Sequence, residues 1–195
     1  MLNEAIYYKK NAFEIFKGVK FMSPAANIGH ASIVTNLICT IGVYVKQNKL
    51  GYTFGDNMDV HLPDGSLFRP DFTVVCAENA EIVTKNIGGT IHGVPDMVVE
   101  VLSKSTRNRY LGIKKDAYES NGVREYWIID PWSNTIYTYI LRDGKFELGG
   151  EYIHYTQTEF DLLDEDEKAA VKYEVPVELF PDFKVKLTDI FDWYI

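Results

Sequence analysis

Two stretches decide the fold: RPDFTVVC at residues 69–76, and PDMVVEVLSKSTRNRYLGIKKDAYESNGVREYWIIDP at residues 95–131. Each contains one acidic residue in an apolar β-type run: Asp71 in residues 68–76 and Glu100 in residues 97–102. A carboxylate inside a strand needs a reason, because burying one without a partner is costly. A helix-like segment with Lys114 follows the second run. Two carboxylates on neighbouring strands beside an ammonium predict a site that holds Mg²⁺ against a phosphodiester.

Apolar periodicity and turn chemistry predict the elements around these stretches. Apolar residues recur at helical spacing over residues 30–46, which predicts an amphipathic core helix. A second helix is expected from Thr106, its N-cap, to Asn121, with Gly122 closing it. Strand or hairpin patterns occupy residues 13–22, 52–54, 58–62, 125–130 and 135–148, with a further strand over 151–157 and an irregular connection over 77–94.

This order of elements predicts an α/β or mixed α+β fold, in which helices flank a mixed β-sheet and a β-hairpin is added near the C-terminus. The strand around Glu100 is apolar on both sides, so we expect it to be central and buried on both faces. We predict a single domain over residues 1–195. Its core would span about 13–131, and a hairpin and packing tail would span 132–195.

Composition narrows the class of protein. The chain has 195 residues, 46% hydrophobic and 25% charged, which is ordinary for a globular protein. A net charge of −8 argues against a nonspecific nucleic-acid coat protein. Cys39 and Cys76 lie in apolar runs and are expected to be reduced core residues. We find no signal peptide pattern and no run approaching the ~18 apolar residues of a membrane span, so a cytoplasmic protein is expected.

Several motifs occur together in a specific order. They are FEIFKGVKFMSP before the first helix, RPDFTVV, PDMVVEVLSKST, the Lys114 to Tyr118 step, NGVREYWIIDP and FPDFKVKLTDIF. Over residues 13–191, this order and spacing resemble the Uma-two type restriction endonuclease family, within the PD-(D/E)XK nuclease superfamily. The resemblance implies a restriction-endonuclease-like core, with a mixed sheet flanked by helices and carboxylates on adjacent strands.

The resemblance also assigns roles to individual positions. Asp71 takes the place of the Asp in the PD motif, and Glu100 that of the second acid. The wider superfamily has a lysine two residues beyond that acid, where this chain has Leu102; the related family is expected to supply it from the following helix, as Lys114. Tyr110 stands where relatives often have an acidic residue.

Other residues extend the predicted site. The backbone carbonyl of Val101 is a candidate metal ligand beside Asp71 and Glu100. Glu14 matches an acidic position of the family and would hold a second metal or hydrogen-bond Lys114, with a solvent-facing strand residue as the alternative. His30 opens the first helix, as a catalytic group or as a capping or surface histidine. Lys115 is interpreted as surface charge, or as the substitute for Lys114.

A local excess of positive charge follows the strand that carries Glu100. Between residues 103 and 124 there are six basic residues and two acidic ones. Lys104, Arg107 and Arg109 in this segment would bind backbone phosphates, or form a solvated helix start. The acidic run at residues 161–167 is interpreted as a solvated loop or helix start.

The resulting prediction is a Mg²⁺-dependent endonuclease that hydrolyses phosphodiester bonds of DNA, with Mn²⁺ as an alternative ion. A homodimer is expected, because two sites related by a two-fold axis suit the cutting of both strands. The leading alternative is a nuclease-fold module without useful activity that binds nucleic acid or a protein partner. A hydrolase of another phosphate ester is a third candidate. No membrane partner is expected.

Overall fold

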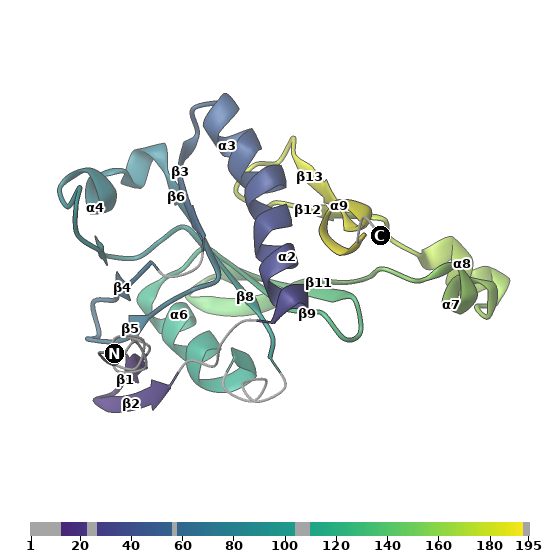
Figure 1. The fold of residues 1–195 in the computed structure, drawn as a ribbon, viewed down its shortest axis with the longest axis horizontal. Coiled ribbons are helices and arrows are strands. Elements are labelled where there is room, and N and C mark those ends of the chain that lie inside the picture. Colours follow the sequence, from purple (N-terminus) through teal and green to yellow (C-terminus); the bar gives the residue numbers. More distant parts are fainter. Residues whose placement is uncertain (1–12, 23–26, 56–57, 104–109, 193–195) are drawn as a thin grey trace, which may run out of the picture.

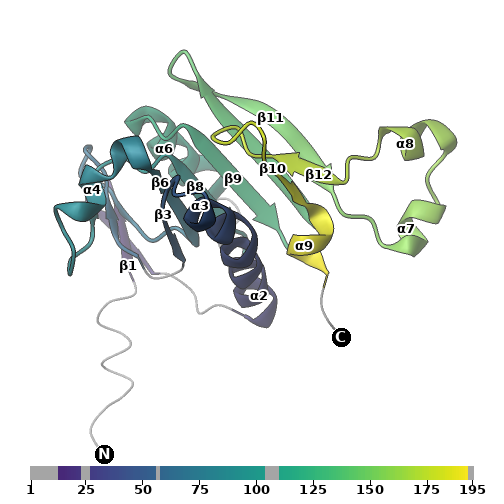
Figure 2. The same ribbon diagram turned by 90° about the horizontal axis from the view of Figure 1, so that it is seen from above.

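The computed structural model describes residues 13–22, 27–55, 58–103 and 110–192. Its main sheet has six strands in the order β11-β10-β9-β8-β6-β3 (Figure 1 and Figure 2). The strands are β3 (Gly51–Gly55), β6 (Phe72–Cys76), β8 (Met97–Val101), β9 (Glu125–Asp130), β10 (Thr135–Arg142) and β11 (Lys145–Ile153). β8 and β9 pair in parallel and the other neighbours are antiparallel. The sheet is therefore mixed, as predicted, and β8 is central and buried on both faces.

A second sheet has the order β2-β1-β5-β4-β7. Its strands are β1 (Phe13–Phe16), β2 (Val19–Met22), β4 (Val60–His61), β5 (Leu67–Phe68) and β7 (Ile91–His92). β1 and β2 form the predicted hairpin, and its turn places Lys17 and Gly18 at φ 47° and 77°. This left-handed conformation is one that glycine adopts at no steric cost.

The expectation of one strand over residues 68–76 is wrong. β5 ends at Phe68 in the small sheet, and β6 begins at Phe72 in the main sheet. Pro70 lies between them and has no N–H to donate to a ladder. Asp71 therefore lies at the point where the chain passes from one sheet to the other, directly before β6.

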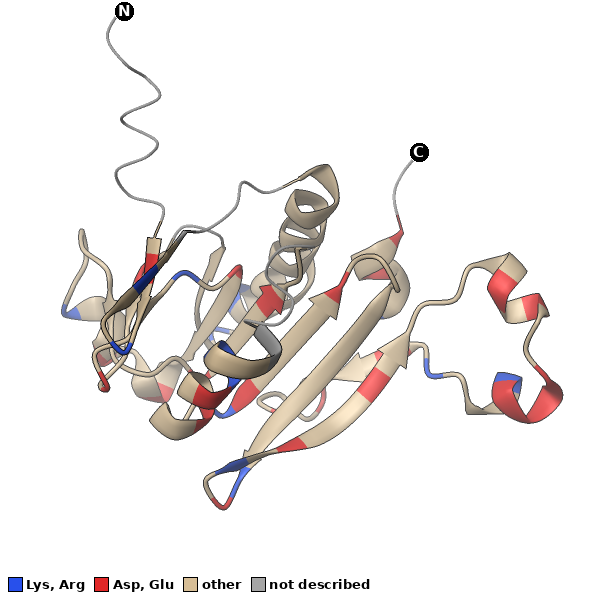
Figure 3. Cartoon of the chain, turned by 90° about the horizontal axis from the view of Figure 1, so that it is seen from below, with Lys and Arg blue, Asp and Glu red and all other residues tan. Residues whose placement is uncertain are grey.

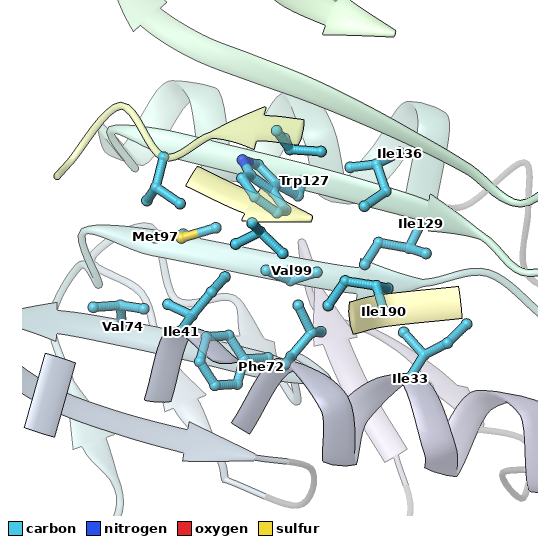
Figure 4. Packing of buried hydrophobic residues seen from close by; sticks show 14 of the residues in the cluster. Ile33, Ile41, Phe72, Val74, Met97, Val99, Trp127, Ile129, Ile136 and Ile190 are labelled. Atoms are coloured by element: carbon cyan, nitrogen blue, oxygen red, sulfur yellow. The ribbon is translucent and has the colours of Figure 1, made fainter. Parts of the chain in front are cut away.

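A long helix covers one face of the main sheet. It runs through α2 (Ile28–Leu37), a π-helical turn η1 (Ile38–Gly42) and α3 (Val43–Gln47). The side chain of Asn27 accepts a hydrogen bond from the backbone N–H of His30, so Asn27 is the N-cap. The buried side of the helix packs on Phe72, Val99 and their neighbours, as Figure 4 shows.

The same helix corrects one sequence-based expectation. The helix over residues 28–47 has a mean hydropathy of 1.5. By length and composition alone, it is long and apolar enough to cross a membrane. The expectation that no segment approaches this length is therefore wrong. In the structure Ile33, Leu37 and Ile41 are fully buried against the sheet, so this side of the helix forms part of the hydrophobic core.

The opposite face of the main sheet is covered by another helix and by the small sheet. The π-helical turn η3 (Tyr110–Lys114) continues into α6 (Lys115–Asn121), and Gly122 ends the helix at φ 90° as predicted. The predicted N-cap Thr106 lies outside the described residues. Tyr118, Leu102 and Phe68 belong to the apolar cluster on this face. The connection after β6 contains a 3-10 turn η2 (Ala77–Asn79) and α4 (Glu81–Thr84).

The C-terminal residues return to the body of the protein, as expected. β12 (Glu174–Pro176) and β13 (Lys184–Lys186) form a small hairpin that leads into α9 (Leu187–Phe191). Glu125, fully buried on β9, fixes this segment: its carboxylate accepts hydrogen bonds from the indole of Trp127 at 2.7 Å and from the backbone N–H groups of Glu178 and Leu179 at 3.1 and 3.0 Å.

Between β11 and β12 the chain forms α7 (Gln157–Asp161) and α8 (Glu165–Ala170), which project away from the body in Figure 2. Figure 3 shows acidic residues concentrated there, and Asp164 caps α8 through Glu167 as a capping box. The acidic run is thus an exposed helix start. Residues 151–153 continue β11 rather than forming a further strand, and Cys39 is exposed, whereas Cys76 is buried as expected.

Candidate active site

Asp71 is a buried carboxylate at the junction of the two sheets. Its Oδ2 accepts a hydrogen bond from the backbone N–H of Val101 at 2.7 Å, which joins Asp71 to β8 one residue after Glu100. Its Oδ1 lies 3.0 Å from Nε2 of His30, which is itself buried on the first turn of α2. The long helix and the central strand therefore hold this carboxylate from two sides.

Glu100 is fully buried on β8 and faces the helix η3–α6. Its Oε1 accepts two hydrogen bonds, from Nζ of Lys114 and from the hydroxyl of Tyr118, both at 2.7 Å. Its Oε2 is also buried and has no hydrogen-bond partner among the residues that the structure describes. An orphaned oxygen on a buried carboxylate is costly unless something binds it, which makes Oε2 of Glu100 a candidate ligand for a cation.

Lys114 is the buried cation of this site. Its Nζ lies 2.6 Å from Oε1 of Glu14 and 2.7 Å from Oε1 of Glu100, and 5.5 Å from the ring centre of Phe68. Glu14, also buried, accepts a further hydrogen bond from the backbone N–H of Arg69 at 3.0 Å. The interpretation of Glu14 as a solvent-facing strand residue is thus wrong. Its carboxylate contacts Lys114, which agrees with the alternative in which Glu14 hydrogen-bonds that lysine.

The charge balance of the site favours a cation. Three carboxylates belong to the site: Glu100 and Glu14 pair with the ammonium of Lys114, and Asp71 binds the backbone N–H of Val101 next to Glu100. The pKa of Glu100 is raised to about 8, first by burial and then by the charges of Asp71 and Glu14, against the lowering effect of Lys114. A divalent ion would relieve this repulsion between carboxylates.

The structure brings together most of the predicted site residues and separates others. Asp71, Glu100, Lys114, Glu14, His30 and the backbone of Val101 form one connected group. Lys115 points elsewhere, with its Nζ 4.4 Å from the ring centre of Tyr139. Leu102, at the position of the superfamily lysine, is buried in the apolar cluster that also contains Tyr118. Lys104, Arg107 and Arg109 lie outside the described residues, as does the side chain of Tyr110.

Sequence reasoning gave Tyr118 no polar role. The ring does pack, with its centre 5.4 Å from that of Phe68 and 5.2 Å from that of Tyr126. Its hydroxyl nevertheless donates to Glu100. The signal was present in the spacing, because residues four apart lie on the same side of a helix and Lys114 precedes Tyr118 by four.

A second acidic group lies near the start of β8, formed by Cys76, Glu78 and Asp96, with one ligand atom of each within 4.8 Å of the others. Arg124 already pairs with Glu78 at 3.0 Å and with Asp96 at 3.2 Å. Burial raises the pKa of the Cys76 thiol to about 12, so it stays protonated near neutral pH. The carboxylates of this group are therefore already paired with Arg124, as in a structural ion pair. The thiol is a poor metal ligand here, because thiols bind metals as the thiolate.

The group around Asp71 and Glu100 fits a hard divalent cation better. Both residues offer carboxylate oxygens, Oε2 of Glu100 is available, and each oxygen of Asp71 has lone-pair capacity beyond its one hydrogen bond. Mg²⁺ and Mn²⁺ prefer such oxygen ligands, and one or two carboxylates suffice because the ion keeps several waters.

The chain is similar in sequence to one protein family and in fold to a solved structure. The sequence model of a family described as "Uma2: Putative restriction endonuclease" matches residues 4–175. A solved structure from Anabaena variabilis, whose title describes "a putative nuclease belonging to DUF820", superimposes with a TM-score of 0.68 at 18% sequence identity. The alignment covers 92% of this chain and 89% of that chain, which confirms the predicted fold class. No curated protein matches the sequence at a significant level.

Proposed function

The chain belongs to the Uma2 family of restriction-endonuclease-like proteins, and from this premise we propose that it is a divalent-metal-dependent endonuclease that hydrolyses phosphodiester bonds of DNA. The family and the fold support a nuclease. The finer proposal, a metal-dependent reaction on DNA, depends on one observation: a buried carboxylate oxygen, Oε2 of Glu100, without a hydrogen-bond partner among the described residues and beside the second carboxylate, Asp71.

The residues of the site have distinct roles in this proposal. Asp71 and Glu100 would hold the cation, with the carbonyl of Val101 as a further candidate ligand. When bound, Mg²⁺ or Mn²⁺ supplies Lewis-acid polarisation of the phosphate and a more acidic water. Lys114 places a fixed positive charge where negative charge develops on the phosphate, in a buried setting where such charges act strongly. Glu14 holds this ammonium in place, and His30 holds Asp71.

DNA is the proposed substrate. The chain as a whole is acidic, with a net charge of −8, so we do not expect it to bind DNA tightly without regard to sequence. The basic segment at residues 104–109 follows β8 directly in the sequence and is the proposed phosphate-binding segment. A homodimer, also proposed, would present two such sites to the two strands of a duplex.

The experiment that tests this function is cleavage by the purified chain of supercoiled plasmid, linear duplex DNA, single-stranded DNA and RNA. Each substrate is incubated with Mg²⁺, with Mn²⁺, and with EDTA. We expect nicking or linearisation of plasmid with either ion and none with EDTA, because the carboxylate pair requires a counter-ion. Cleavage of RNA alone would change the substrate. Failure of the folded chain to cleave any substrate with any ion would favour the binding-module alternative.

The raised pKa of Glu100 predicts a pH dependence of cation binding. The proton on a carboxyl group of pKa about 8 competes with the cation. As pH rises from 6 to 8 the proton is lost, so the association constant should increase by up to about tenfold per pH unit and level off above the pKa. Calorimetric titration with Mg²⁺ in buffers of different ionisation enthalpy should also show up to one proton released per ion near pH 7. An association constant that stays constant across this range would contradict the prediction.

A further inference from the structure

The carboxylate of Glu100 is held asymmetrically. Two donors reach the same oxygen, Oε1: the ammonium of Lys114 and the hydroxyl of Tyr118, each at 2.7 Å. The two donors are four residues apart, one at the end of η3 and the other in α6, so they project from one side of a continuous helix. The other oxygen, Oε2, is buried and receives no hydrogen bond from any described residue.

Hydrogen bonds on Oε1 restrict how Glu100 can bind a cation. A carboxylate that binds an ion with both oxygens must turn both toward it. Oε1 is directed toward the helix by two short hydrogen bonds, one of them charge-assisted, and such bonds are among the strongest in proteins. The carboxylate therefore offers Oε2 alone.

The ring of Tyr118 is itself fixed, so its hydroxyl cannot follow a rotating carboxylate. The side chain is fully buried and packs against Phe68 and Tyr126. The hydroxyl of this fixed ring is the donor of the 2.7 Å hydrogen bond to Oε1 of Glu100.

We propose that Tyr118 is a positioning residue that, together with Lys114, reserves Oε2 of Glu100 for one-oxygen binding of a cation and so favours Mg²⁺ over Ca²⁺. This inference rests on the proposed function, because it concerns the same site. The physical basis is a difference between the two ions. Mg²⁺ demands near-ideal octahedral geometry with short bonds, whereas Ca²⁺ accepts more ligands and commonly takes both oxygens of a carboxylate.

The test is Tyr118→Phe, which removes the hydroxyl and keeps the ring. Tyr139→Phe is the matched control: Tyr139 stacks on Tyr126 in the same aromatic group, and its own ring meets Lys115 rather than Lys114. Affinities for Mg²⁺ and for Ca²⁺ are measured by calorimetry on metal-free protein at pH 8, without substrate. We expect Tyr118→Phe to weaken Mg²⁺ binding about tenfold and Ca²⁺ binding by much less, since partners of metal ligands typically contribute 10–100-fold.

The ratio of the two affinities separates a positioning role from a structural one. General loosening of the fold would weaken both ions alike, and Tyr139→Phe should change neither. An unchanged Mg²⁺ to Ca²⁺ ratio in folded Tyr118→Phe would overturn the inference while leaving the proposed function intact. Failure of the parent chain to bind either ion would overturn both. Should Tyr118→Phe not fold, a crystal structure of the parent with Mn²⁺ decides: Oε2 alone at the ion supports the inference, and both oxygens at the ion refute it.

Discussion

Replacing Lys114 with methionine is expected to reduce DNA cleavage by about 10³-fold, because loss of one preorganised electrostatic group in a buried site typically costs 10²–10³-fold. Methionine has a similar length and is apolar, so it fills the space beside Phe68 without supplying charge. Glu14 and Glu100 would then face each other without the ammonium that lies 2.6 and 2.7 Å from them. Initial rates of plasmid nicking at saturating Mg²⁺, compared with the parent, measure the effect.

The same variant should carry a pH signature in its stability. Lys114 lowers the pKa of Glu100, so its removal raises that pKa further. A carboxyl group whose pKa is raised in the folded state favours folding at low pH and loses that contribution as pH rises through the folded pKa. The melting temperature of metal-free Lys114→Met should therefore fall relative to the parent at pH 8 and recover toward pH 6.

Lys115→Met is the control for this experiment. Lys115 is adjacent in sequence, yet it contacts the ring of Tyr139 and not the carboxylates. Its cleavage rate should stay within a few-fold of the parent. If Lys115→Met abolished cleavage and Lys114→Met did not, the assignment of the lysine would be wrong.

The sequence predicted the individual elements of this fold well, because their signals are local. The helical spacing over residues 30–46, the hairpin at residues 13–22 and the αL glycine at 122 each reflect a constraint that acts within a few residues. The division of residues 68–76 between two sheets was not predictable in the same way. It depends on β5 pairing with β1 and β6 pairing with β8, and such non-local pairings leave no trace in a nine-residue window.

The site shows the same limit. Asp71 and Glu100 could be singled out because an acid in an apolar strand is anomalous by itself. The contact between Glu14 and Lys114 was one of the alternatives offered for Glu14, but choosing it required knowing that the N-terminal hairpin joins the small sheet beside β5. The hydroxyl of Tyr118 was hidden for a different reason: a buried tyrosine in an apolar cluster looks like packing, and only the rotation of the helix about its axis decides where the hydroxyl points.

Asp71→Asn is expected to weaken cation binding and slow cleavage, each by about 10³-fold, because two unit charges about 4 Å apart interact by about 4 kcal/mol at an effective dielectric constant of about 20. Asparagine keeps the size of the side chain and an acceptor for the backbone N–H of Val101, so the junction between the sheets should remain folded. What is lost is the negative charge that, with Glu100, attracts the ion.

Residual binding in this variant should titrate differently. The charge of Asp71 contributes to raising the pKa of Glu100, so its removal should shift the pH midpoint of the remaining cation binding downward. Calorimetry at pH 6, 7 and 8 measures both the affinity and this shift. Asp96→Asn, at the other candidate acidic group, is the matched control and should leave the affinity unchanged. Loss of binding in Asp96→Asn with retention in Asp71→Asn would move the metal to the group of Cys76, Glu78 and Asp96, where Arg124 would first have to leave.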